Sequence, residues 1–157
     1  MPKTKKKTQV HKRSITTNDA VKKMMTHTWE PKLDSRFLCH MTGKDGNPVI
    51  PVFLIKEVTR PSISVKNNLQ MWNPLQIKMY DPESPSAAKL LYDYAKAGMG
   101  EFDIIIDVLN PTGNSIEKWE IKNAKITDID FGTLKWSSRE PVEITATIKY
   151  SSATLLY

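Results

Sequence analysis

The chain has 157 residues, enough for one domain that buries a core of its own. No apolar run approaches the ~20 residues that a membrane-spanning helix needs, and polar residues follow the basic start. We therefore expect no transmembrane span and no signal peptide. The single cysteine, Cys39, excludes an internal disulfide and fits a reducing cytosol.

The positive charge lies at the N-terminus. The formal net charge is +6, and residues 1–13 alone contain six basic residues and no acidic residue. The rest of the chain is balanced, with 17 basic and 17 acidic residues. We interpret residues 1–27 as an arm that is either solvated or docks on an acidic surface or on phosphate. Its N-terminal basic residues are Lys3, Lys5, Lys6, Lys7, Lys12 and Arg13.

The first regular pattern after the arm is that of a β-hairpin. Trp29 indicates an extended piece that anchors on a domain surface. Residues 35–57 then alternate apolar and polar side chains around a turn at 43–47 that contains an Asp-Gly pair. The return strand is expected over 49–58, and Pro51 indicates that part of it lies at a sheet edge.

The middle of the chain predicts one strand and the one clear helix. Residues 70–80 alternate in the manner of a strand. The pattern over 84–97 predicts a helix, with Ser84 as the N-cap, Pro85 at the first helical position and Gly98 after the last turn. Its apolar face, at helical spacing, comprises Ala87, Leu90, Leu91, Tyr94 and Ala95.

The C-terminal third predicts long antiparallel strands. Residues 142–150 alternate between apolar and polar side chains. In 102–109 every second residue from Phe102 to Val108 is apolar, and the other face carries Asp103, Ile105, Asp107 and Leu109. Within 116–126 the apolar parity changes near Asn123, so we expect a bulge there. Gly132 permits a backbone bend between the last two strands. Residues 28–157 thus predict a mainly β, β-rich α+β domain, an antiparallel sandwich or barrel with one flanking helix.

No pattern typical of an active site is present. The three histidines are scattered without metal-ligand spacing, and neighbours on a strand such as Cys39 and His40 point to opposite faces. We expect no catalytic residue, no metal site, no cofactor and no enzymatic activity. Two same-face acidic pairs on predicted strands are read as solvated faces: Asp103 with Asp107, and Asp128 with Asp130.

A resemblance to a protein family begins in the last strands. Residues 124–150 read A-x-I-x-x-x-x-F-G-x-L-x-W-S-S-x-x-P-x-E-I-T-x-T-I-x-Y, which resembles the C-terminal signature of tail tube proteins from contractile-tailed bacteriophages. Shorter matches follow in the same order across residues 28–157. The signature residues are Trp29, Pro31, Arg36, Arg60, Pro61, Tyr80, Asp81, Pro82, Trp119, Phe131, Gly132, Trp136, Pro141 and Tyr150.

The resemblance implies a structural virion protein that does no chemistry. Subunits of this family form homohexameric rings that stack into the inner tube of the phage tail, and strands of each subunit join one shared inner β-barrel. The implied partners are further copies, the sheath, the baseplate and the tape-measure protein, with assembly in the host cytoplasm and no membrane. Double-stranded genomic DNA passes through the lumen without specific binding. Because a lumen that passes DNA should not retain phosphate, Asp103 and Asp107 are the candidate lumen-facing residues.

One segment departs from the family pattern. The family usually carries a longer stretch, with a hairpin that reaches the adjacent ring, where this chain has only residues 64–71. Either the basic arm takes over part of the stacking between rings, or the protein is a tube-like baseplate initiator at the tube end. An inner tube of a non-viral contractile injection system is a further alternative. A monomeric module that binds nucleic acid through the Lys-rich tail, with salt-sensitive affinity, is another.

Overall fold

The computed structural model describes residues 31–157, and the folded unit spans Leu33–Tyr157. The basic arm and Trp29 lie outside the described residues, so the expectations for them stay predictions. In chain order the elements are β1 (Phe37–Gly43), β2 (Pro48–Ile50), the 3-10 turn η2 (Val52–Leu54), β3 (Ile55–Val58), β4 (Ile63–Lys66), β5 (Leu69–Trp72), β6 (Leu75–Tyr80), α2 (Ala87–Lys96), β7 (Phe102–Leu109), β8 (Ser115–Asp130), β9 (Glu143–Lys149) and β10 (Ser152–Leu155).

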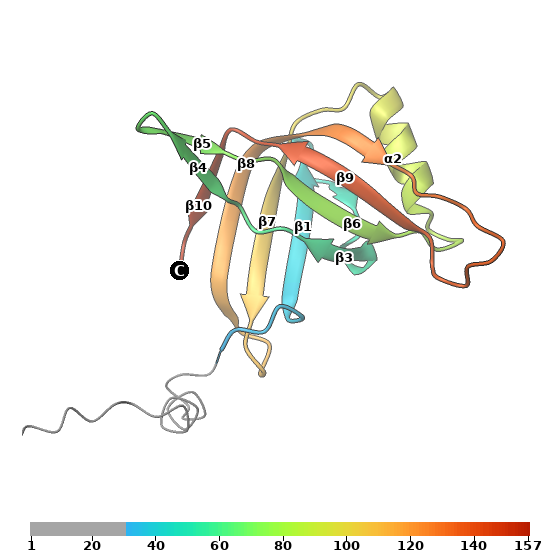
Figure 1. Cartoon of the computed structure of the whole chain (residues 1–157), viewed down its shortest axis with the longest axis horizontal. Helices are drawn as coiled ribbons and strands as arrows, with labels where there is room; N and C mark the ends of the chain where they lie inside the picture. Colours follow the sequence, from blue (N-terminus) through green and yellow to red (C-terminus); the bar gives the residue numbers. More distant parts are fainter. Residues whose placement is uncertain (1–30) are drawn as a thin grey trace, which may run out of the picture. The chain divides into compact units, whose positions relative to one another are not determined.

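One antiparallel sheet organises the unit. Its strand order is β2-β1-β7-β8-β9-β6-β3, and β10 pairs with β8 beside this path. The long strand β8 pairs with β7 up to Ala124 and with β9 from Lys125 onward, so it belongs to two halves of the sheet. Figure 1 shows β9 and β6 crossing β8, β7 and β1 at an angle. We call β2, β1, β7, β10 and the N-terminal part of β8 the β1 half, and the remaining strands of this sheet the β9 half.

The bend between the two halves coincides with the predicted bulge, which is confirmed. Asn123 has a positive φ of 52°. The register pairs Phe102 with Ala124 but Ile104 with Ile121, so β8 contains one extra residue opposite β7. Because the extra residue changes the parity of the strand, Ile121 and Ala124 both face the core.

The core lies between the two halves and follows the predicted alternation. Every second residue of β6, β7 and β9 is buried, and all of these side chains except Val108 belong to one cluster with the helix residues Ala87 and Leu91. The predicted β-rich fold with one flanking helix is confirmed. The largest fully buried side chains are Phe102, Met41, Ile50, Leu75, Ile77, Met79, Leu91, Ile104, Ile106, Ile121, Ile144 and Ile148.

The first hairpin differs from its prediction in the return strand. Instead of one strand over 49–58, the chain forms the short β2, the η2 turn after Pro51, and then β3, which pairs with β6. Proline has no backbone N–H to continue the ladder, so the chain leaves β1 at this point and crosses to the other half. As a result β2 contacts only the end of β1, at Met41 and Thr42.

The helix begins two residues later than predicted, and Ser86 rather than Ser84 is its N-cap. The Lys89 N–H donates to Ser86 Oγ at 3.2 Å, which satisfies one amide of the first turn. Ser86 Oγ in turn donates to Asp81 Oδ1 at 2.9 Å, so Asp81, directly after β6, holds the side chain of the N-cap in place. Pro85 therefore precedes the helix. Within residues 31–157 no helix is both long and apolar enough to span a membrane.

Residues 63–72 form a hairpin of their own, β4–β5, which pairs with no other strand of the described residues. Asn67 and Asn68 have φ values of 49° and 62°, as a tight two-residue turn requires. The segment is short, yet it projects from the sheet at the upper left of Figure 1. The chain therefore does carry a hairpin at the place where the sequence suggested that a family feature was reduced.

Candidate functional site

The outer face of the β1 half carries the two predicted lumen residues. Cross-strand pairing between β7 and β8 places Asp107 opposite Lys118 and Ile105 opposite Glu120 on this face. Asp103 and Asp107 share this face, on the side opposite to the buried residues of β7. This face therefore carries charged side chains together with the apolar Leu38 and Ile105, and its residues lie on the side of the sheet opposite to the core.

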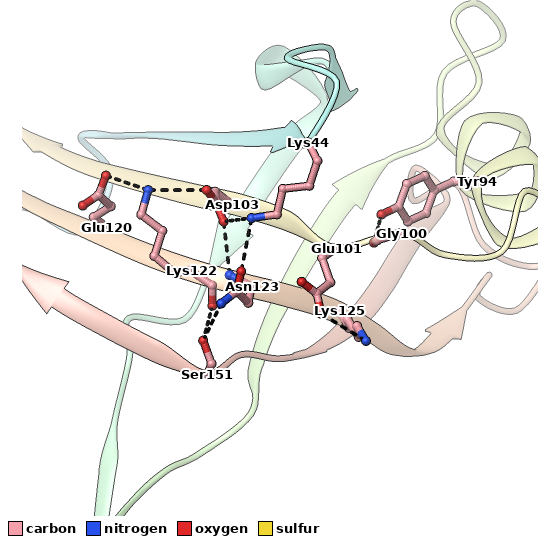
Figure 2. Close-up of polar contacts among 10 residues, drawn as sticks. All are labelled: Lys44, Tyr94, Gly100, Glu101, Asp103, Glu120, Lys122, Asn123, Lys125 and Ser151. Atoms are coloured by element: carbon pink, nitrogen blue, oxygen red, sulfur yellow. Dashed lines mark hydrogen bonds and ion pairs between the residues drawn. The ribbon is translucent and has the colours of Figure 1, made fainter.

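The two predicted lumen carboxylates, Asp103 and Asp107, are paired within the chain. Lys44 Nζ lies 3.0 Å from Asp103 Oδ1, and Lys122 Nζ lies 3.4 Å from Asp103 Oδ2. Lys122 also lies 3.0 Å from Glu120, and Figure 2 shows these side chains converging beside the bulge. Lys118 Nζ lies 3.7 Å from Asp107 Oδ1. The cations and the carboxylates of this face therefore neutralise each other.

The network holds Asp103 in its charged form. Burial by itself raises the pKa of Asp103, but the hydrogen bonds from Lys44, from the Asn123 N–H at 3.1 Å and from Lys122 outweigh it and lower the pKa below its ordinary value. The same carboxylate thereby fixes the bulge, because it binds the backbone of the bulged residue. The hydrogen bond that Lys122 donates to Glu120 raises the pKa of Lys122, and the hydrogen bond to Asp103 raises it further.

The β1 half has an open strand edge on each side. The edge of β1 that faces away from β7 has no partner strand within residues 31–157 over Phe37–His40, because β2 pairs only with the end of β1. On the other side, β10 pairs with β8 alone among the described strands. Neighbouring strands are antiparallel throughout β1, β7, β8 and β10, so β10 runs opposite to β1. Open edges present unpaired N–H and C=O groups to a further strand.

A buried carboxylate ties the hairpin to the β1 half. Arg60, at the base of β4–β5, donates from Nη1 to Glu117 Oε1 at 3.1 Å, and the Trp119 indole donates to the same oxygen at 2.7 Å. The Glu117 side chain is only 5% exposed, whereas that of Arg60 is 62% exposed. The family signature of the sequence contains Arg60 and Trp119, and the structure brings them together at Glu117.

Two further contacts hold the strand ends of the hairpin. The Trp72 and Tyr150 rings pack with centroids 5.9 Å apart. Asn73 donates to Ser62 Oγ at 3.1 Å and accepts from Ser64 Oγ at 2.9 Å, which clamps the two strands together. The direction of the hairpin is therefore set by the body of the domain.

The loop 131–142 is the second projecting segment. It contains no strand or helix, and Leu134 is 83% exposed while Trp136 is fully exposed. Gly132 has a φ of 83°, and a Cβ there would lie 2.6 Å from the Glu143 carbonyl oxygen, so the sharp entry to the loop requires glycine. The loop surrounds an open hollow of about 760 Å³. Its lining includes Leu134, Trp136, Ser138, Pro141 and Val142.

The remaining signature residues have structural positions. The Arg36 carbonyl accepts from the Leu109 N–H at 2.8 Å and continues the β1–β7 ladder. Asp81 caps the approach to α2, and the Lys56 ammonium lies 5.5 Å from the centre of the Tyr80 ring. Pro31 and Pro82 lie in connecting segments, and Pro61 lies between β3 and β4. These residues position elements rather than form one site.

Two features of the site were missed in the sequence. The buried position of Glu117 was not predicted. The signal for it is an acidic residue two positions before Trp119, on the side of β8 that also carries Ile121. The pairing of β10 with β8 was also missed, because residues 152–155 alternate weakly and are mostly exposed. Residues 31–157 contain no group of three or more metal-ligating side chains.

Comparisons with known proteins give the same fold. No protein-family model and no curated protein matches the chain in sequence. A chain in the six-fold symmetrised baseplate of the anti-feeding prophage matches with a TM-score of 0.60 at 17% identity, over 80% of this chain and 95% of that chain. A chain in the sheath/tube terminator of an extracellular contractile injection system, PVC, matches with a TM-score of 0.64 at 15% identity, over 81% and 97%.

Hcp1 from an E. coli pathovar matches with a TM-score of 0.58 at 9% identity, over 78% of this chain and 91% of Hcp1. The chain therefore has the fold shared by Hcp and by chains of contractile injection particles, which is the fold that the sequence resemblance implied.

Proposed function

We propose that the protein is a subunit of the inner tube of a phage tail, in which homohexameric rings stack within a contractile sheath. The observation that carries this proposal is the pair of open edges on the β1 half. Apart from the short β2, which covers only the end of β1, the half contains four strands, β1, β7, β8 and β10, and each neighbouring pair is antiparallel. When copies are related by rotation about an axis along the strands, β10 of one copy meets β1 of the next in antiparallel orientation.

Ring closure through these edges satisfies both of them at once. The contact is heterologous, because different surfaces of the two copies meet, and such contacts form closed rings when the rotation closes. A closed barrel is also the arrangement that removes open sheet edges altogether. The six-fold symmetry of the anti-feeding prophage baseplate supports a ring of six for this chain as well.

In such a ring the outer face of the β1 half lines the lumen, because its other face is covered by the core. Asp103 and Asp107 then face the lumen, each with its own lysine partner. A wall whose cations are already paired offers few sites for phosphate, since polyanion binding depends on cations that can replace counterions. The proposal is that double-stranded DNA passes this wall without specific binding.

The proposal assigns the other surfaces to protein partners. The hairpin β4–β5 and the basic arm contribute to stacking between rings, and the sheath, baseplate and tape-measure proteins contact the assembled tube. The particle is assembled in the host cytoplasm as part of the virion. No enzymatic activity is proposed, since the described residues form a structural fold with paired or solvated carboxylates.

A second candidate function is supported by the comparisons. The matching structures come from the anti-feeding prophage, an extracellular contractile injection system and Hcp1, so an inner tube of a non-viral injection system fits the fold equally well. A subunit at the tube end, such as a baseplate initiator, is the third arrangement. Gene neighbours separate the first two, because a phage tube gene lies beside other virion genes.

Negative-stain electron microscopy of the purified chain across a range of concentrations tests the proposal. Long hollow tubes are expected for the main tube subunit. Isolated rings that never stack would favour the subunit at the tube end. Monomers at every concentration, with the fold intact by circular dichroism, would contradict self-assembly through the two edges.

A further inference from the structure

A cluster of polar side chains lies between the two open edges of the β1 half. These edges, along β1 and along β10, are separated by β7 and β8. Asn123 is the bulged residue of β8, and Figure 2 shows Lys44, Asp103 and Ser151 gathered around it. The three residues come from the turn after β1, from β7 and from the connection that leads into β10. The cluster therefore contains a residue from each of the four strands or from the turn beside it.

The last strand of the chain turns a corner at Asn123. β8 pairs with β9 at Lys125 and Lys149, and with β10 at Lys122 and Ser152. The two pairs lie three positions apart on both strands, so the register continues across the corner and Asn123 stands opposite Ser151. The Ser151 N–H and Oγ both donate to the Lys122 carbonyl, at 3.2 and 3.1 Å. β10 is thus the continuation of β9 beyond this corner, and its place at the edge of the β1 half depends on the corner.

The side-chain amide of Asn123 reaches toward both edges. Its Oδ1 accepts from Lys44 Nζ at 3.2 Å, and its Nδ2 donates to Ser151 Oγ at 3.2 Å. Because a lysine ammonium group can only donate, the oxygen end of the amide must face Lys44, which leaves the nitrogen end for Ser151. Lys44 Nζ also lies 3.0 Å from Asp103 Oδ1, so the turn after β1 is held to β7 and to β8 at once. One planar amide therefore joins the turn at the end of β1 to the residue before β10.

Asparagine is the residue type that meets both demands of this position. The backbone has a φ of 52°, which asparagine tolerates better than most residues other than glycine. Glycine would accept the backbone but has no side chain to join the two edges. Ser151 Oγ already donates to the Lys122 carbonyl, so it needs a donor from residue 123, which an ionised aspartate does not have. The amide of asparagine supplies an acceptor and a donor together.

We propose that Asn123 is a positioning residue for assembly, whose amide holds the β1 edge and the β10 edge of one copy in a fixed arrangement. The proposal rests on the ring contact proposed above and adds the residue that prepares both edges for it. A heterologous contact closes into a ring only when the rotation from copy to copy closes, so the two edges need one defined relation. A strand that is ordered before binding also loses less conformational freedom on binding. The side chains of β10 are mostly exposed, so core packing alone holds this strand weakly.

Hydrogen exchange of the full chain, at concentrations too low for assembly, tests the positioning role. Asn123→Gly permits the same backbone and removes both links of the amide. Exchange is expected to accelerate roughly threefold to tenfold in residues 152–156 and in residues 43–47, because each segment loses one exposed hydrogen bond. Exchange in β9 should stay unchanged. Asn68→Gly is the matched control, since Asn68 has a φ of 62° in the turn between β4 and β5, and it should leave both segments unchanged.

Two further variants separate the two ends of the amide. Ser151→Ala removes the link toward β10 and is expected to accelerate exchange in residues 152–156 only. Lys44→Met removes the link toward the turn after β1 and is expected to accelerate exchange in residues 43–47 only. Unchanged exchange at both edges in Asn123→Gly would overturn the proposal. Uniform acceleration across the domain would overturn it as well, because Asn123 would then stabilise the fold as a whole.

Electron microscopy of the same variant supplies the assembly readout. Asn123→Gly is expected to raise the concentration at which rings and tubes appear by roughly fivefold or more, because the two edges must then be ordered at the moment of binding. Faster exchange at both edges with an unchanged tube concentration would overturn the positioning role while the tube function stands. Wild-type chains that stay monomeric at every concentration would overturn the proposed function and this role together.

Discussion

The two-halved sheet and its two projecting segments use similar apolar residues in opposite ways. In the sheet, Ile104, Ile121 and Ile144 are completely buried against one another. In the hairpin β4–β5 and the loop 131–142, residues such as Val65 and Leu134 are mostly exposed, although Val65 lies in a paired strand. The difference teaches that the apolar residues of the sheet stabilise the fold of one copy, whereas those of the projections are available for contacts between copies.

The largest effect expected from this comparison is in the core. Phe102 is fully buried and packs edge-on against Tyr94, so Phe102→Ala should lower the free energy of unfolding by about 3–5 kcal/mol. Leu134→Ala in the loop should change it by less than about 0.5 kcal/mol. Urea unfolding of the unassembled chain, with both variants in parallel, measures the two values.

A large loss of stability for Leu134→Ala would break the comparison. It would mean that the loop packs on its own domain in solution and contributes to the core. The sheet and the loop 131–142 would then both stabilise the fold of one copy, and the loop would not be available to another copy.

A smaller effect is expected at the junction of β8 with the loop. Gly132→Ala should cost about 2–3 kcal/mol, because the new methyl group meets the Glu143 backbone at 2.6 Å and the φ of 83° is unfavourable for alanine. Gly46→Ala is the matched control, since its φ of 81° is similar but nothing lies within 4 Å of the added atom. If the two variants unfold at the same denaturant concentration, the backbone clash is not real.

The junction of the hairpin with the sheet should show an intermediate loss. Arg60→Ala removes one partner of the buried Glu117 carboxylate and should cost about 1–2 kcal/mol. Hydrogen exchange should accelerate most in residues 63–72, because the hairpin loses an anchor. Lys66→Ala, at the tip of the same hairpin, is the control and should leave exchange in the sheet and the hairpin base unchanged. Uniform acceleration across the domain would show that Arg60 stabilises the whole fold instead.

The sequence predicted the sheet better than the projections, for a physical reason. In β6, β7 and β9 an apolar residue stands at every second position, which indicates burial of that face, and the parity change at Asn123 located the bulge. The prediction of one strand over 70–80 was wrong. Residues 69–72 form β5 of the hairpin and residues 75–80 form β6 of the main sheet, and the hairpin was missed because β4 and β5 carry apolar residues on both faces. The helix start was misplaced because Ser84 and Ser86 are both capping residues, and only the position of Asp81 distinguishes them.

The candidate site was predictable only in part. The alternation placed Asp103 and Asp107 on one face, but their lysine partners come from distant parts of the chain. No periodicity reveals that Lys44, in the first hairpin turn, reaches Asp103. The open edges of β1 and β10 likewise depend on the strand order, which local pattern does not determine.

The smallest expected effect is on the outer face of the sheet and depends on pH. The pKa of Asp103 is lower in the folded chain than its ordinary value of about 3.9, so the unfolded chain binds a proton first as the pH falls. The contribution of Asp103 to stability is therefore present above about pH 4 and is lost as the pH falls through its folded pKa. Asp103→Asn should cost about 0.5 kcal/mol at pH 7, as expected for a partly exposed ion pair.

The difference between Asp103→Asn and the wild type should vanish once the pH lies well below the lowered pKa of folded Asp103, because both side chains are then neutral. It should also shrink in 1 M salt, which screens the partly exposed pair with Lys44. Urea unfolding of the two chains at several pH values measures this convergence. A cost that persists unchanged at low pH would show that the charge of Asp103 is not what stabilises the fold at this position.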